Sequence, residues 1–319
     1  MTDKVLIFEA AGDGGGRFVK GITVKCKKTG FTIVELMTAV AIIAMLIAIL
    51  IPALAMVRKV AKETQQKAQF ATIGLALTAF KGDYGDYPPS DIRLYRMGFY
   101  SGAQKLAEAM VGQDLLGFHK DSIFRSDLRV DLPGESGYEL YPDDLDPTRE
   151  DGRENLDARM GPYLELKTAR AFRLGDTSEH DGLFDATRLL DEDTYVLCDV
   201  FGVKKVTLAE GETAKAGTPI LYYRANTSSK TMTTGQPEER IYSGLDNMEL
   251  IALGKLPEPD PDDQHKLYEE RDLFYSEDYG IIDQRVEIST RWPHRPDSYI
   301  LISAGADGEY GTSDDIFNF

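Results

Sequence analysis

Three aspartates near the C-terminus have the residue types and spacing of a cation-binding turn. Asp307, Asp314 and Asp315 lie in the glycine-rich run ISAGADGEYGTSDDI. Carboxylates are hard oxygen ligands that suit a cation such as calcium, and a glycine-rich turn can bring them together. The D-x-D-x-D-G spacing of an EF-hand is absent. A solvated acidic turn is the alternative interpretation.

The remaining side chains form no recognisable catalytic pattern. The histidines are isolated and contain no H-E-x-x-H pair; they are His119, His180, His265 and His294. After residue 30 the chain has no G-x-S-x-G motif, Walker sequence or dinucleotide fingerprint. Cys198 lies in a strand-like run, where a thiol is usually part of a core. The sequence therefore predicts a protein that is not an enzyme.

A single acidic residue, Glu35, interrupts a long apolar segment that spans residues 31–57. The other non-apolar residues of this segment are Thr32, Thr38 and Pro52. A helix of that length reaches about 40 Å, which exceeds the ~30 Å hydrocarbon core of a bilayer. A buried helix of a soluble core is the alternative, but such helices rarely run this long without a polar face. The segment is therefore expected to enter a membrane.

Basic residues precede the apolar segment and predict its orientation. They include Arg17, Lys20, Lys25, Lys27 and Lys28, against Asp3, Glu9 and Asp13. The positive-inside bias then keeps the N-terminus in the cytoplasm. Basic residues also follow the segment and weaken this bias, although a long acidic domain is translocated largely regardless of its charge.

The composition excludes several classes of protein. The 319 residues carry a formal net charge of −17, and the only cysteines are Cys26 and Cys198. Two cysteines rule out a disulfide scaffold and a multi-cysteine zinc site. The acidic balance argues against a nucleic-acid-binding protein that works through a broad basic surface.

The junction before the apolar segment resembles the class III signal of type IV pilins and type II secretion pseudopilins. In that family a short basic leader ends in Gly, a Phe follows, and Glu is the fifth mature residue. Here KCKKTG ends at Gly30, Phe31 follows and Glu35 is the fifth residue after the junction. Pro52 falls where the family commonly carries a helix-kinking proline. The resemblance implies cleavage of the Gly30–Phe31 bond by a prepilin peptidase, which also methylates the new amino group.

The resemblance gives Glu35 and Pro52 a role in assembly. Cleavage creates an α-amino group on Phe31 that is normally positive near pH 7. In a filament, Glu35 of one subunit would neutralise that amine on its neighbour, so that neither charge is buried alone. The alternative is that Glu35 only stabilises the first helical turn and reaches the interface. Pro52 removes one helical hydrogen bond, so a bend or local melting is expected there.

The helix is expected to continue beyond the membrane to about Lys81. Phe70, Ile73, Leu77 and Phe80 recur at helical spacing. A polar face is expected from Lys59, Lys62, Glu63, Gln65, Gln66 and Lys67. The run GDYGDYPPS, which begins at Gly82, is a stop signal.

Beyond the helix the sequence predicts an α+β domain. A second helix is expected from Ser101, and residues 120–190 read as a loop-rich, charged insertion. Strands are expected at 194–200, 219–225, 248–253 and 298–304. The fold class is therefore a long N-terminal helix packed on a C-terminal antiparallel sheet, as in pilins.

Three further segments resemble the type II secretion major pseudopilin. They are GDYGDYPPS, the run DVFG followed by PILYYRA, and the C-terminal ISAGADGEYGTSDDI. In many members of that family the C-terminal motif binds calcium, so the resemblance implies calcium at Asp307, Asp314 and Asp315.

The resemblance predicts a structural pseudopilin with four parts: a leader (1–30), a transmembrane and assembly helix (31–57), its soluble extension (58–81), and an extracytoplasmic head (82–319). The subunit would lie in the bacterial inner membrane with its head in the periplasm. Its partners would be prepilin peptidase, other pseudopilins, copies of itself in the filament, and the secretion platform, with no nucleic acid. The alternatives are a type IV pilin for adhesion, motility or DNA uptake, or a membrane-tethered binding domain.

Overall fold

The computed structural model describes most of the chain from Gly30 to Phe319. The described residues are 30–95, 98–142, 144–176, 181–208, 212–232, 236, 239–260, 262–277, 280–283, 285 and 292–319. The expected leader therefore lies outside them except for Gly30. The chain divides into two compact units, Met1–Leu54 and Ala55–Phe319.

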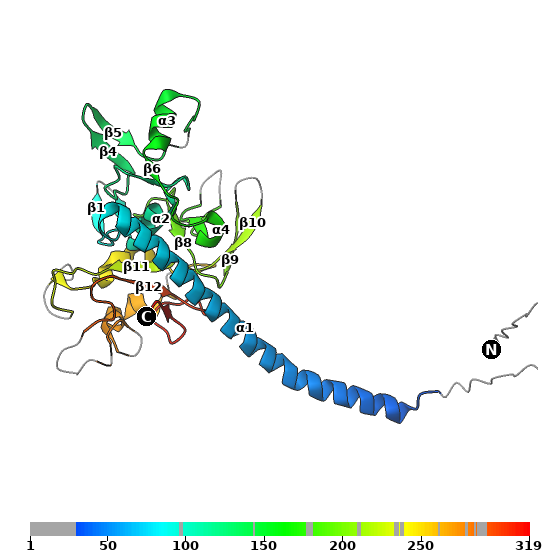
Figure 1. The fold of residues 1–319 in the computed structure, drawn as a ribbon. Helices are drawn as coiled ribbons and strands as arrows, with labels where there is room; N and C mark the ends of the chain where they lie inside the picture. Colours follow the sequence, from blue (N-terminus) through cyan, green and yellow to red (C-terminus); the bar gives the residue numbers. More distant parts are fainter. Residues whose placement is uncertain are drawn as a thin grey trace, which may run out of the picture. The chain divides into compact units, whose positions relative to one another are not determined.

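The predicted long helix is present as α1, Ile33–Tyr84 (Figure 1). It ends three residues later than the sequence suggested, because Asp83 and Tyr84 complete its last turn. Gly85 then adopts a φ of 84°, and its N–H donates to the Lys81 carbonyl oxygen at 2.8 Å. A glycine after the last helical residue accepts this left-handed conformation without steric cost.

Within the unit Ala55–Phe319, α1 packs through the apolar positions that the sequence predicted. Phe70, Ile73, Leu77 and Phe80 are all buried. The predicted polar face is wrong at Gln66, which is fully buried. Its side chain is not directed to solvent because it hydrogen-bonds the backbone of the segment that α1 packs on.

A polar clamp joins α1 to residues 198–201. The Gln66 Oε1 atom accepts from the Val200 N–H at 3.0 Å, and the Gln69 Nε2 atom donates to the Cys198 carbonyl oxygen at 3.0 Å. One turn earlier, the Lys62 ammonium donates to the carbonyl oxygens of Val200 and Phe201. These side chains satisfy backbone groups that would otherwise be buried without partners.

A three-stranded antiparallel sheet, in the order β11-β12-β13, forms the centre of the head. It consists of β11 (Leu221–Arg224), β12 (Tyr299–Ser303) and β13 (Ile316–Phe317). Alternate side chains enter two different cores, as a pleated strand requires. Tyr222 and Leu301 face the core shared with α1 and α2 (Gly102–Val111). Tyr223 and Ile300 face the core shared with α5 (Met248–Ile251) and α6 (Lys266–Glu269). The predicted strands at 219–225 and 298–304 are confirmed.

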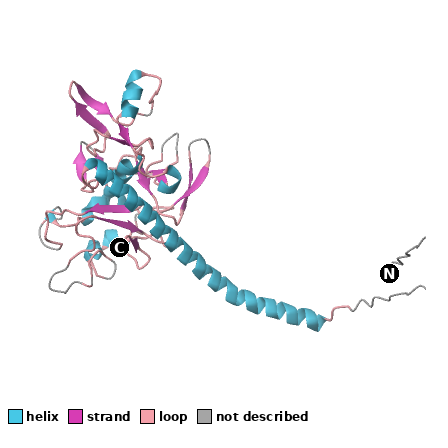
Figure 2. Cartoon of the chain, viewed as in Figure 1, coloured by secondary structure: helices cyan, strands magenta, loops and turns pink. Residues whose placement is uncertain are grey.

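The remaining elements are short (Figure 2). The helices are α2 (Gly102–Val111), α3 (Glu150–Asp157), α4 (Leu166–Ala169), η3 (Gly244–Asn247), α5 (Met248–Ile251), α6 (Lys266–Glu269) and η4 (Arg271–Tyr275). The two-stranded sheets are β1–β2 (Arg93–Tyr95, Gly98–Tyr100), β3–β6 (Phe118–His119, Arg159–Met160), β4–β5 (Arg129–Leu132, Glu135–Glu139), β7–β8 (Ala171–Arg173, Tyr195–Leu197) and β9–β10 (Lys204–Thr207, Thr213–Ala216).

The structure confirms one predicted element and contradicts another, at α2 and at α5. The helix predicted from Ser101 is confirmed as α2, and Ser101 and Gln104 form a reciprocal capping box at its start. The strand predicted at 248–253 is wrong, because α5 occupies Met248–Ile251. Met, Glu and Leu are good helix formers. Helix geometry also buries the adjacent Leu250 and Ile251 together, which an alternating strand would not do.

The charged segment 120–190 contains more regular structure than a loop. It holds the β4–β5 hairpin, α3, α4 and β7. Sequence patterning missed these elements because they are short and their stability comes from contacts with the rest of the head rather than from periodicity.

Candidate processing and assembly site

The junction between Gly30 and Phe31 is accessible in the structure. Gly30 has no regular secondary structure, and the Phe31 side chain is 79% exposed. A Cβ atom placed on Gly30 would meet nothing within 4 Å. The fold therefore places no steric demand for glycine at this position, and the role of Gly30 in processing stays a prediction.

Glu35 closes a capping box at the start of α1. The Glu35 Oε2 atom accepts from the Thr32 backbone N–H at 2.9 Å and from the Thr32 Oγ1 hydroxyl at 2.8 Å. In return, the Glu35 N–H donates to the Thr32 Oγ1 atom at 3.2 Å. The T-x-x-E spacing is the sequence signature of this motif, and sequence reasoning had assigned Glu35 only to the helix dipole or to a neighbouring subunit.

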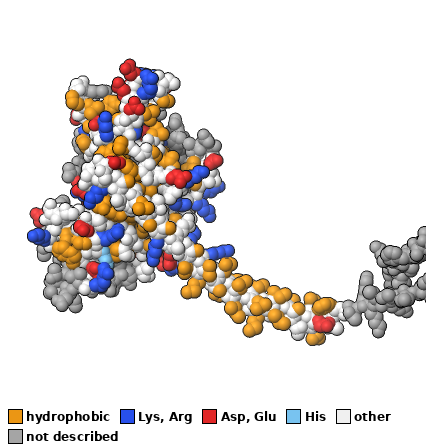
Figure 3. Space-filling model, in the orientation of Figure 1, with side chains coloured by type: hydrophobic (Ala, Val, Ile, Leu, Met, Phe, Trp, Pro, Cys, Tyr) orange, Lys and Arg blue, Asp and Glu red, His pale blue; other side chains and the backbone are white. Residues whose placement is uncertain are grey.

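The first half of α1 is covered by apolar side chains that no described part of the chain buries. Every large hydrophobic residue from Phe31 to Val60 is about half exposed or more, and Figure 3 shows them around this part of the helix. By length and composition, α1 is the one described helix able to cross a membrane. A continuous apolar surface of this kind marks contact with lipid or with other helices.

Pro52 lies within this apolar part, and α1 is continuous through it. The helix assignment shows no melted residue on either side of Pro52. The role of Pro52 in assembly stays a prediction.

The three C-terminal aspartates lie in one turn but make different contacts. Asp307 accepts from the Glu309 N–H and from the Thr312 hydroxyl, at 3.0 and 2.8 Å. Asp314 pairs with Lys59 of α1, with 2.9 Å between its Oδ1 atom and the Lys59 Nζ atom. No sequence pattern indicates this pair, because its members are 255 residues apart in the chain.

Asp315 differs from the other two because one of its oxygens lacks a partner. Its Oδ2 atom accepts from the Gly311 N–H at 2.8 Å, whereas its Oδ1 atom is buried with no hydrogen-bond partner. Burial raises the pKa of this carboxyl to about 8. Among the described residues, no group of three His, Cys, Asp or Glu side chains is placed to hold a metal ion. Any cation bound at this turn would need backbone oxygens as well.

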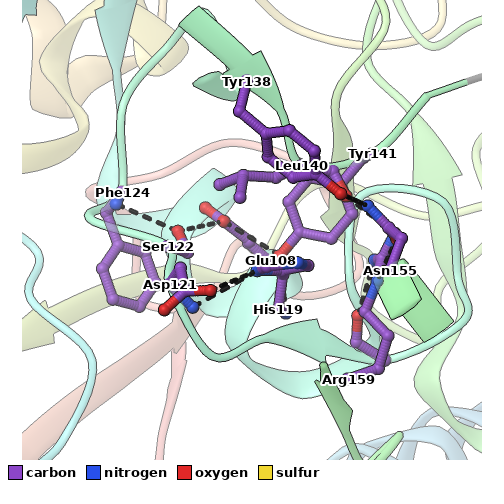
Figure 4. Close-up of polar contacts among 11 residues, drawn as sticks. Glu108, His119, Asp121, Ser122, Phe124, Tyr138, Leu140, Tyr141, Asn155 and Arg159 are labelled. Carbon is purple, nitrogen blue, oxygen red and sulfur yellow. Dashed lines mark hydrogen bonds and ion pairs between the residues drawn. The ribbon is translucent and has the colours of Figure 1, made fainter. Parts of the chain in front are cut away.

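A buried polar network anchors the segment after α2 (Figure 4). Glu108 of α2 accepts from the hydroxyls of Tyr100, Ser122 and Tyr141, at 2.8, 2.5 and 3.1 Å. Burial raises the pKa of Glu108, while the three donors oppose that shift. Glu108 is completely buried, so we assign it a structural role: it fixes residues 119–141 against α2.

His119 is part of the same network and is neutral. The imidazole Nδ1 atom of His119 accepts from the Asp121 backbone N–H at 3.2 Å, and the backbone N–H of His119 donates to the Tyr141 hydroxyl oxygen at 3.1 Å. Burial, reinforced by the nearby Arg159 guanidinium, lowers the pKa of His119 to about 4. In the sequence His119 is an isolated histidine, and no motif around it indicates this network.

Comparison with known proteins connects the junction to one motif. The family model described as the prokaryotic N-terminal methylation motif matches residues 25–51. Neither the curated proteins nor the solved structures yielded a match. The motif runs directly into the exposed apolar half of α1, as in type IV pilin-like proteins. It implies processing by a prepilin peptidase and assembly into pilus-like filaments.

We expect His119 to make the head sensitive to mild acid. The unfolded chain binds a proton at this residue near pH 6.5, whereas the folded chain does so only near pH 4. Between these values the unfolded state holds more protons, so the histidine lowers stability by up to about 1.4 kcal/mol for each pH unit of acidification. Chemical denaturation at several pH values should therefore give a shallower pH slope for His119→Gln than for the wild type. Parallel slopes would contradict this assignment.

Proposed function

We propose that this protein is a structural subunit of a type IV pilin-like filament and not an enzyme. One observation carries the proposal: the methylation motif at residues 25–51 continues into a helix whose apolar surface is exposed on all sides. The prepilin peptidase cleaves the Gly30–Phe31 bond and methylates the amino group of Phe31. Before assembly the subunit is held in the bacterial inner membrane, with its N-terminus in the cytoplasm and its head in the periplasm.

Within this class we favour a pseudopilin of type II secretion over an adhesive or motility pilin. The C-terminal aspartate turn and the GDYGDYPPS run resemble the major pseudopilin. Small pilins usually end in a loop closed by two cysteines, but after cleavage this chain keeps only Cys198, which is buried. The partners would then be other pseudopilins and the secretion platform of the inner membrane.

Glu35 has two interactions available to it, and they act at different stages. In the single chain its carboxylate accepts two hydrogen bonds from Thr32 and begins the helix. In a filament the same carboxylate faces a desolvated environment, where an unpaired charge costs several kcal/mol. The amino group that cleavage creates on Phe31 of a neighbouring subunit supplies the missing positive charge. We propose that this charge pair, rather than the capping box, drives assembly.

Two matched substitutions separate these roles. Glu35→Gln keeps an oxygen that accepts the Thr32 hydrogen bonds but removes the charge, so we expect membrane insertion with loss of most filament incorporation. Thr32→Ala removes the hydroxyl part of the capping box but keeps the charge, and a lost cap costs only about 1 kcal/mol. We therefore expect near-normal incorporation for Thr32→Ala. Sheared-filament fractions and membrane fractions, compared by immunoblot, measure both quantities.

The reverse ranking of these variants would contradict charge pairing and favour the capping role. Normal incorporation of both would leave Glu35 without a role in assembly. If no variant, the wild type included, entered filaments, the helix would instead be the tether of a membrane-bound head.

We further propose that the C-terminal turn binds calcium through Asp307, Asp314 and Asp315 together with backbone oxygens, because the three carboxylates by themselves are not placed as a metal site. The buried, unpartnered Oδ1 atom of Asp315 supports a cation at this place, since a cation would supply the partner that the protein does not. When bound, calcium would neutralise the clustered carboxylates. Without calcium, the Lys59 ammonium neutralises one of these carboxylates, that of Asp314.

Calcium should therefore raise the melting temperature of the detergent-extracted protein. A ligand at a hundred times its Kd stabilises the folded state by about 2.7 kcal/mol, so a shift of several degrees is expected at millimolar calcium. Asp315→Asn should abolish the shift, while magnesium serves as the control ion. An unchanged melting temperature of the wild type at millimolar calcium would exclude the site.

A further inference from the structure

A basic pocket lies on the head beside the part of α1 that follows the apolar segment. Its volume is about 530 Å³, and four cationic residues line it: Lys62, Lys167, Arg170 and Lys215. No acidic residue is among its lining residues. This is unusual for a chain whose formal net charge is −17.

The cations of this pocket are not neutralised by carboxylates. The Lys62 ammonium donates to two backbone carbonyl oxygens, those of Val200 and Phe201. The Arg170 guanidinium likewise donates to the carbonyl oxygens of Asp199 and Lys215. Throughout the described ranges, none of the four forms an ion pair with an acidic side chain. The pocket therefore holds four positive charges that a bound anion would neutralise.

The β9–β10 hairpin adds positive charge at the same place. In its register Lys205 lies directly opposite Lys215. Like charges opposite each other on an antiparallel pair destabilise it. An anion bound beside Lys215 would offset this repulsion.

The position of the pocket along α1 matches the headgroup layer of a membrane. Lys62 follows Val57, the last residue of the apolar segment, by five positions, which is about 7.5 Å along a helix. The polar layer on each side of a hydrocarbon core is about 5 to 7.5 Å thick. Lys62 thus reaches the outer part of that layer when residues 31–57 span the membrane.

The rim of the pocket is apolar as well as basic. Leu166 and Leu208 both line it, and their side chains are 45% and 39% exposed. Figure 1 shows α4, which supplies Leu166 and Lys167, and the β9–β10 hairpin, which supplies Ala214 and Lys215, next to α1. A free phosphate has no apolar part that could contact the exposed leucines. A phospholipid does, because its glycerol and upper acyl carbons lie beside the phosphate.

We propose that this pocket binds the phosphate of an anionic phospholipid while the subunit is stored in the membrane. The lysines and Arg170 hold the phosphate, and the leucines contact the glycerol region. The proposal rests on the membrane insertion put forward above. It adds a function for the head in that state: lipid binding fixes the head against the membrane surface before the helix is extracted into a filament.

Native mass spectrometry of the full-length chain, released from micelles that contain equal amounts of phosphatidylglycerol and phosphatidylcholine, tests the proposal. The test variant is Lys167→Gln/Lys215→Gln, because both lysines are exposed and removing them leaves the α1 clamp intact. The control variant is Lys230→Gln/Lys266→Gln, which makes the same charge change at exposed lysines outside the pocket.

We expect the wild type and the control to retain phosphatidylglycerol in preference to phosphatidylcholine. Each lysine near a membrane surface contributes about fivefold to the affinity for anionic lipid, so the test variant should bind about 25-fold more weakly. Equal retention of the two lipids by the wild type, or equal loss in test and control variants, would overturn the proposal. If the protein bound inorganic phosphate at millimolar concentration but retained neither lipid, the pocket would be a site for free phosphate, and the proposal would be overturned as well.

Fractionation of the same cells separates this proposal from the proposed function. A chain found in the membrane that shows no lipid preference contradicts only the lipid site. A chain that is not found in the membrane contradicts the membrane-stored subunit itself.

Discussion

The apolar surface of the first half of α1 is the constraint on which the rest of the molecule depends. The large hydrophobic residues from Phe31 to Val57 are about half exposed or more, and no described part of the chain covers them. Water is a poor solvent for such a surface, because each buried CH₂ group is worth about 0.8 kcal/mol. Lipid or the apolar helices of other subunits would cover it. The membrane-stored filament subunit proposed above would use both environments in turn.

The second half of α1, in contrast, is largely buried on one face, because it packs against the folded head. Apolar residues such as Leu77 enter the core, and Gln66 and Gln69 satisfy the backbone of residues 198–200. Buried amides that bond to backbone groups fix both position and register, because a shifted helix would leave those groups unpaired. The head is therefore bound to the same helix that carries the apolar assembly surface.

Sequence patterns captured the features that depend on local chemistry and regular spacing. They predicted the helical repeat of Phe70 to Phe80, the stop near Gly82, the helix that begins at Ser101, and two of the three strands of the central sheet, β11 and β12. Features that depend on distant contacts were not predicted. The pair between Lys59 and Asp314 joins residues 255 positions apart, and the hydrogen bond that accompanies the burial of Gln66 spans 134 positions. The network around Glu108 joins nearer residues, up to 33 positions away, but their spacing matches no helix or strand period. The Thr32–Glu35 capping box is the exception, because its T-x-x-E spacing was present in the sequence and overlooked.

Cleavage at the Gly30–Phe31 bond is the central claim, because it creates the charge that Glu35 is proposed to neutralise. Mass spectrometry of the N-terminal peptide, from protein extracted from membranes of its native host, measures this directly. We expect a mature chain that begins with N-methylated Phe31. A chain that retains residues before Gly30 would contradict it.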